Sequence, residues 1–101
     1  MRASYVLRKY GTSVADLETL LGTQDFGCAI CRSPWQECPP AKKVAHEAHF
    51  LHHLCVDHDH KTGGVRGLLC NACNTAIGLL GENVSRLRSA ERYLLETRGK
   101  K

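Results

Sequence analysis

The chain has 101 residues, 24% of them charged, and a formal net charge of +4. That length gives room for one domain, and the composition is that of an ordinary folded protein, which excludes two-domain and disordered architectures. No run approaches the roughly 20 apolar residues of a membrane-spanning helix, and charges interrupt the apolar residues of positions 1–11, unlike a signal peptide. We therefore expect a single domain, residues 1–101, that is cytoplasmic and has no membrane partner.

The basic residues are concentrated toward the two ends. Residues 1–11 hold three basic groups and no acid, and residues 82–101 hold six basic groups against three acids. The middle, residues 12–81, has five basic and seven acidic residues, a formal charge of −2. Basic flanks could neutralise phosphates that the acidic centre would repel, although the same pattern is typical of a normally solvated surface.

Helical periodicity first occurs in residues 13–21, where apolar residues recur at helical spacing. Thr12 or Ser13 can cap the start of this helix, and Gly22 is expected to end it. A shorter apolar pattern suggests an earlier helix within residues 1–10.

Further along the chain, all three prolines lie within residues 32–43, which predicts a loop. A histidine-rich helix is expected over residues 44–54. A Lys-Thr-Gly-Gly turn signal makes residues 55–69 a β-hairpin, and a helix follows over about residues 70–80. The last helix, residues 84–97, carries an apolar stripe that we expect to pack on the protein's own core.

Two Cys-x-x-Cys pairs, Cys28 with Cys31 and Cys70 with Cys73, are separated by 38 residues. Two such pairs supply the four sulfurs of a closed, structural zinc site, which small domains commonly need in order to fold. Two disulfides or a redox Cys-x-x-Cys are the alternatives. Zinc is favoured because no thioredoxin-like pattern surrounds either pair.

Between these pairs lies the run Asp57-His58-Asp59-His60. Cleavage of a phosphodiester needs a base that activates water and a divalent ion that stabilises charge on the phosphate and the leaving oxygen. Asp57 and Asn74 offer hard oxygen ligands for Mg²⁺ or Mn²⁺, and neutral His58 is a suitable base. If the segment is extended, the two aspartates share one face and the two histidines the other. The residue types alone equally allow a second zinc site here.

The runs VDHDHKTG at residues 56–63 and VRGLLCNACN at residues 65–74 resemble the recombination endonuclease VII family, a branch of the HNH or His-Me finger nucleases. This resemblance implies a small α+β fold, a zinc-stapled ββα-metal domain with a core of about residues 26–81. N- and C-terminal helical flanks, residues 1–22 and 82–101, would border that core. The four paired cysteines would hold the zinc.

The resemblance also implies the roles of individual residues. His58 matches the family's general base, while Asp57 and Asn74 match its ligands for the catalytic divalent ion. His60 would lie near the phosphate or the metal, and Asp59 would support the hairpin.

Three further polar residues lie in or beside the matching runs. Arg66 and Lys61 are candidate contacts to the DNA backbone, or else solvent-facing charges. Asn71 is expected to cap the helix that follows the hairpin, because Asn is a favoured capping residue.

One departure from the family's pattern is Cys55, which stands where many members carry a histidine. It could join Cys38 and a histidine in a second zinc site, but we favour a buried Cys55 and a free loop thiol at Cys38. His46, His49 and His53 would share one helical face, and we expect them to be surface or packing residues.

These observations predict a divalent-metal-dependent DNA endonuclease that nicks DNA in a bacterial or phage-infected cell. Only about twenty residues follow Gly81, too few for the large C-terminal region with which endonuclease VII resolves branched DNA as a dimer. The sequence leaves monomer and homodimer open. The alternatives are a non-catalytic zinc-stabilised DNA-binding module and an interaction domain of a phage packaging or repair complex.

Overall fold

The computed structural model describes residues 11–40 and 48–97. Within them lie three α-helices, two strands that form one antiparallel sheet, and two short 3-10 helices, which confirms the predicted small α+β class. In chain order the elements are α2 (Val14–Thr23), η1 (Trp35–Glu37), η2 (His49–His52), β1 (Leu54–His58), β2 (Val65–Cys70), α3 (Asn71–Leu79) and α4 (Val84–Thr97).

Helix α2 begins as predicted but ends later. The Ser13 hydroxyl caps it by accepting a hydrogen bond from the backbone N–H of Asp16 at 3.2 Å. Gly22 lies inside the helix, so its prediction as the helix end is wrong. The chain instead reverses at Asp25 and Phe26, whose φ angles are 54° and 61°, because the following loop must return toward the sheet. The helix suggested for residues 1–10 lies outside the described residues.

The predicted β-hairpin is confirmed. Leu54 of β1 pairs with Cys70 of β2, and the register shifts by a bulge between Asp57 and His58. Strand β1 ends at His58, so the expected alternation of side chains does not continue through His60. The hairpin places the Asp-His-Asp-His run at its far end, next to the turn.

The segments before the hairpin are more irregular than β1 and β2. Residues 32–40 form the predicted loop, interrupted by η1. The helix expected over residues 44–54 is wrong in its described part, which consists of η2 and the first residue of β1. Consecutive Phe50 and Leu51 are both buried, so packing of neighbouring side chains against the core has overridden the helical pattern.

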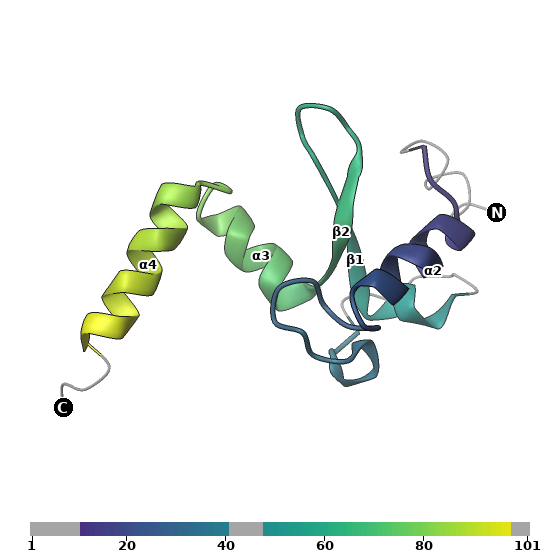
Figure 1. The fold of residues 1–101 in the computed structure, drawn as a ribbon, viewed down its shortest axis with the longest axis horizontal. Coiled ribbons are helices and arrows are strands. Elements are labelled where there is room, and N and C mark those ends of the chain that lie inside the picture. The colour runs from purple at the N-terminus through teal and green to yellow at the C-terminus, as the bar shows by residue number, and fades with distance from the viewer. Residues whose placement is uncertain (1–10, 41–47, 98–101) are drawn as a thin grey trace.

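The core lies where α2 and η2 pack against the hairpin. Its fully buried members include Leu17 of α2 and Leu68 of β2. Phe50 of η2 and Leu54 of β1 are also buried in it. In Figure 1, α2 lies on one side of the hairpin and α3 on the other. The hairpin is therefore the central element, and the loops at its base are fixed by the core.

Buried Gln24 connects α2, the loop after it and β2. Its Nε2 donates hydrogen bonds to the carbonyl oxygens of Gly27, at 2.8 Å, and Leu68, at 3.0 Å. Its Oε1 accepts a hydrogen bond from the N–H of Leu68 at 3.0 Å. The side chain thus satisfies backbone groups on the outer edge of β2 and fixes the loop against that strand.

Helices α3 and α4 match the predicted ranges, but α4 does not pack as expected. It has no buried residue, and Val84, Tyr93 and Leu94 remain exposed. Figure 1 shows α4 extending away from the hairpin, at the end of the molecule opposite α2. The turn at Gly81 directs the chain outward, with a φ of 67°. In the part of the chain that the structure describes, no helix is long and apolar enough to span a membrane.

Candidate metal centre and hairpin site

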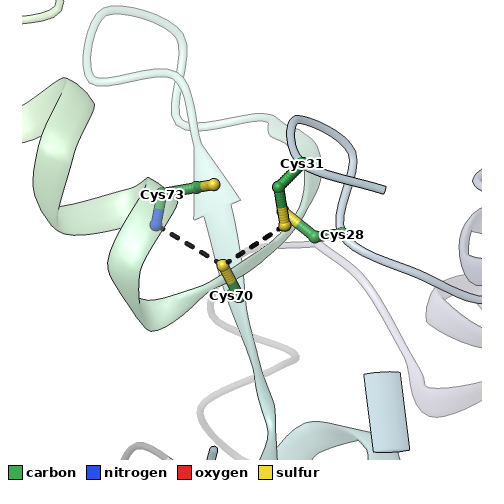
Figure 2. A group of neighbouring side chains, drawn as sticks. All are labelled: Cys28, Cys31, Cys70 and Cys73. Atoms are coloured by element: carbon green, nitrogen blue, oxygen red, sulfur yellow. Dashed lines mark hydrogen bonds between the residues drawn. The ribbon is translucent and has the colours of Figure 1, made fainter. Parts of the chain in front are cut away.

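The four paired cysteines meet at the base of the hairpin. Cys28 and Cys31 come from the loop after α2, Cys70 ends β2, and Cys73 lies in the first turn of α3. Their sulfur atoms all lie within 4.8 Å of one another, and those of Cys31 and Cys70 are 3.9 Å apart. Figure 2 shows the four side chains converging from the loop, the strand end and the helix. This confirms that the two pairs, distant in sequence, form one cluster that can hold a metal ion.

Backbone N–H groups hold the first sulfur of each pair. The N–H of Ile30 donates to Cys28 Sγ at 3.4 Å, and the N–H of Cys73 donates to Cys70 Sγ at 3.5 Å. The second bond makes Cys70 the N-cap of α3, so the prediction that Asn71 caps this helix is wrong. The sulfur that would bind a metal ion therefore also satisfies one of the otherwise unpaired N–H groups at the helix start.

The electrostatics of the cluster favour a bound cation. The hydroxyl and the backbone of Ser33 lower the pKa of Cys31 to about 6. Burial raises the pKa of Cys28, but backbone hydrogen bonds outweigh this effect, so the pKa of Cys28 is lowered. Burial and the neighbouring sulfurs raise the pKa of Cys73 far above its usual value. Four sulfurs this close cannot all be thiolates unless a positive charge lies among them. Soft sulfur ligands in this number suit a transition metal ion.

The described residues do not support the predicted alternatives of two disulfides or a second zinc site that includes Cys38 and Cys55. All six lie in the described part of the chain, and none is in a disulfide. Among the same residues, Cys38 and Cys55 join no group of three or more potential metal ligands, so the second zinc site is not formed there. His46 lies outside the described residues.

The favoured prediction is confirmed for Cys38 and only in part for Cys55. Cys38 is a free thiol in the loop, as predicted; it is also buried, and burial raises the pKa of its thiol to about 11. Cys55 is half-buried. His53 is a packing residue as expected: its ring lies edge-on to Trp35, and its Nδ1 donates to the carbonyl oxygen of Cys38 at 2.6 Å.

A second cluster of polar side chains lies at the far end of the hairpin. Arg66 on β2 donates from Nε to Asp57 Oδ2 at 2.8 Å and from Nη2 to Asp57 Oδ1 at 3.1 Å. The same Nη2 donates to Glu82 Oε1 at 3.0 Å, and Glu82 Oε2 lies 3.1 Å from His60 Nε2. Asp57 is thus bonded to Arg66 directly, and Glu82 connects Arg66 to His60. We call these four residues the Asp57–Glu82 network.

Beside this network is an open hollow of about 750 Å³ between the hairpin turn and the α3–α4 turn. His60, Lys61, Arg66 and Glu82 contribute to its lining. Lys61 is exposed, as a contact to the DNA backbone would need to be, whereas the Arg66 guanidinium is engaged by two carboxylates that raise its pKa further.

The remaining predicted residues surround the same end of the hairpin. His58 is the half-buried last residue of β1, and its ring centroid lies 5.2 Å from that of His60. Asp59 supports the turn, since its Oδ1 accepts from the N–H groups of Lys61 at 2.7 Å and Thr62 at 3.1 Å. These bonds lower the pKa of its carboxyl.

Asn74 and Glu82 both come from outside the hairpin. Asn74 is half-buried on α3, the helix that packs against both strands. Sequence reasoning missed Glu82, because it lies in a flank that looked basic overall. The available signal was an acid directly after Gly81, the glycine that follows α3.

The chain is similar in sequence to two phage proteins. The chain is 36% identical over 90 residues to the Gene 59 protein of Mycobacterium phage D29, a match that covers 88% of the chain and 47% of that relative. It is 35% identical over 91 residues to the Gene 59 protein of Mycobacterium phage L5, covering 89% of the chain and 48% of the relative. The chain therefore spans about half the length of these curated relatives. No solved structure matches it. The recombination endonuclease VII family matches residues 3–96, nearly the whole chain, and the chain belongs to that family.

Proposed function

We propose that this chain is a divalent-metal-dependent DNA endonuclease of the HNH type that nicks one strand. The match to the recombination endonuclease VII family over residues 3–96 carries the proposal. Two features of the fold support it: Asp57 and His58 end β1, and the helix that bears Asn74 packs against both strands of the hairpin.

In this proposal His58 is the general base. Its imidazole accepts the proton of the attacking water, whose oxygen forms a bond to phosphorus while the bond to the 3′ oxygen breaks. Neighbouring His60 and exposed Lys61 contact the phosphate. Histidine is the side chain that most often serves as a general base in enzymes.

Asp57 and Asn74 would hold the catalytic Mg²⁺ or Mn²⁺. Carboxylate and amide oxygens are the hard ligands that these ions prefer. The Asp57 side chain is 12% exposed and contacts Arg66, which lines the open hollow. When bound, the ion supplies positive charge that stabilises the phosphate and the leaving oxygen in the transition state. Asp57 would have to turn at least one oxygen away from Arg66 to bind it.

We further propose that the cysteine cluster holds zinc as a structural metal. Tetrahedral zinc with bonds of about 2.3 Å to sulfur requires sulfur–sulfur separations of about 3.8 Å, which the cluster can reach with small shifts. Zinc would fasten the loop after α2 to the junction of β2 and α3. The phage relatives support action in an infected host cell, and the family match supports DNA as the substrate.

One observation favours a second candidate, a non-catalytic DNA-binding module. Both oxygens of Asp57 accept hydrogen bonds from Arg66, an arrangement that a purely structural hairpin would also show. A third candidate, an interaction domain of a packaging or repair complex, is favoured by the exposed apolar residues of α4.

The test uses supercoiled plasmid, zinc-loaded protein, and added Mg²⁺, added Mn²⁺ or no divalent ion. We expect metal-dependent conversion to open circles, and about 100-fold to 10,000-fold slower conversion by His58→Ala, the usual range for loss of a general base. His49→Ala, which removes an exposed histidine outside the hairpin, is the matched control. Zinc content and DNA binding should be equal in all three proteins. If wild-type protein binds DNA but never converts plasmid, the binding module is correct.

A further inference from the structure

Glu82 joins two predicted site residues that would otherwise have no link to each other among the bonds described above. One carboxylate oxygen accepts from Arg66 at 3.0 Å, and the other lies 3.1 Å from His60 Nε2. Arg66 in turn holds both oxygens of Asp57. Arg66 therefore connects Glu82 to Asp57, the proposed metal ligand. Glu82 itself lies in the α3–α4 turn, outside the hairpin.

The backbone at Glu82 is unusual for a residue with a side chain. Its φ is 54°, in the left-handed region that favours glycine, and it directly follows Gly81 with a φ of 67°. The N–H of Glu82 donates to the carbonyl oxygen of Ile77 at 2.8 Å, which fixes this turn to the end of α3. Strained positions of this kind are concentrated at functional sites. Here the strained residue is the one that carries the bridging carboxylate.

The charges give Glu82 a consequence for cation binding. Asp57 and Glu82 carry two negative charges against one positive charge on Arg66, so these three residues have a formal charge of −1. Without Glu82 the net charge would be zero, and Arg66 would keep its bonds to Asp57 alone. Both effects lower the affinity of Asp57 for a divalent ion, since the ion must then compete with Arg66 and gains less attraction.

We propose that Glu82 is a positioning residue of the nuclease site: its carboxylate anchors Arg66 and His60 at the α3–α4 turn and so leaves Asp57 able to take up the divalent ion. This inference rests on the proposed function. Arg66, retained by Glu82 when Asp57 turns to the ion, then presents its guanidinium toward the hollow where the DNA phosphate would lie. His60 is held at the edge of the same hollow.

The experiment compares Glu82→Gly and Glu82→Gln with wild-type protein, all as the zinc-loaded full chain. Glu91→Gln is the matched control, because it removes the same charge from an exposed position on α4. Mn²⁺ binding is measured by calorimetry, and the Mn²⁺ concentration that gives half-maximal plasmid nicking is measured separately. Thermal unfolding with zinc in excess reports the fold.

We expect both Glu82 variants to raise the Mn²⁺ dissociation constant and the half-saturating concentration about tenfold, the lower end of what loss of a residue behind a metal ligand costs. Glu91→Gln should change neither quantity. Glu82→Gly should unfold at the same temperature as wild type or higher, because glycine relieves the left-handed backbone and exposed ion pairs stabilise little. Weaker binding in a protein that is not less stable cannot be attributed to misfolding.

Two results would overturn the inference and leave the nuclease intact: Glu82 variants that bind Mn²⁺ and nick DNA like wild type, or an equal loss in Glu91→Gln. If wild-type protein neither binds Mn²⁺ at this site nor nicks plasmid, the proposed function fails, and the role of Glu82 fails with it.

Discussion

Replacing Gln24 tests how the loop that carries the first cysteine pair is attached to the hairpin. Gln24→Met keeps a straight side chain of similar volume and removes the three hydrogen bonds to Gly27 and Leu68. The carbonyl oxygen of Leu68 keeps a donor, the N–H of Ala29 at 3.0 Å. The N–H of Leu68, in a residue that is 0% exposed, and the carbonyl of Gly27 lose the partner that Gln24 provides.

These losses set the expected magnitude. A buried polar group without a partner costs about 1–3 kcal/mol, so the orphaned N–H of Leu68 and the orphaned carbonyl of buried Gly27 together should lower the free energy of unfolding by about 2–6 kcal/mol. That is a large share of the roughly 5–15 kcal/mol that stabilises a typical domain. Gain of apolar contact by the methionine offsets little, because the site is lined by backbone polar groups.

The assay is urea unfolding with zinc in constant excess, followed by the fluorescence of Trp35, the only tryptophan. Constant metal is needed because bound zinc adds to apparent stability. Gln36→Met, the same change at an exposed position, should alter the free energy of unfolding by less than about 0.5 kcal/mol. If Gln24→Met also stays within that limit, the side-chain bonds of Gln24 do not secure the loop, and the reasoning is refuted.

Three further predictions concern the metal centre and the hairpin turn. Cys70→Ser should retain the cap of α3, since Ser is a favoured N-cap, but lose zinc in competition with a chromophoric chelator; unchanged zinc affinity would exclude Cys70 as a ligand. Gly27→Ala should lower the thermal midpoint, because the added Cβ would lie 2.5 Å from the carbonyl oxygen of Ser33, while Gly22→Ala, with open space around its Cβ, should not. The Asp59 carboxyl should titrate below 3.8 by carbon NMR. Its folded pKa is lowered, so its contribution to stability is complete above the unfolded pKa and is lost as pH falls through the folded value; a midpoint at or above 3.8 would contradict the turn hydrogen bonds.

Local sequence signals were sufficient wherever one short segment decides its own structure. The Lys-Thr-Gly-Gly turn and its flanking apolar residues specify the hairpin, Ser13 specifies the start of α2, and α4 has the predicted bounds. The cysteine cluster was also predictable, because two Cys-x-x-Cys pairs can satisfy one tetrahedral ion only by meeting.

Predictions were wrong where contacts between distant segments decide the outcome. The histidine-rich segment after residue 47 forms a 3-10 helix, because Phe50 and Leu51 both face the core. Helix α4 has an apolar stripe that would suit a core, but the left-handed turn at Gly81 and Glu82 directs it away from the hairpin.

The sequence by itself determined the fold class, the cysteine cluster and the run that ends β1, because each is written in residues close together or in a spacing that one metal ion enforces. Only the tertiary structure decided the partners of Asp57 and Arg66. An ion pair depends on where two separate elements place their charges. The α3–α4 turn places Glu82 beside His60, which lies 22 residues earlier in the chain, and beside Arg66, which lies 16 residues earlier.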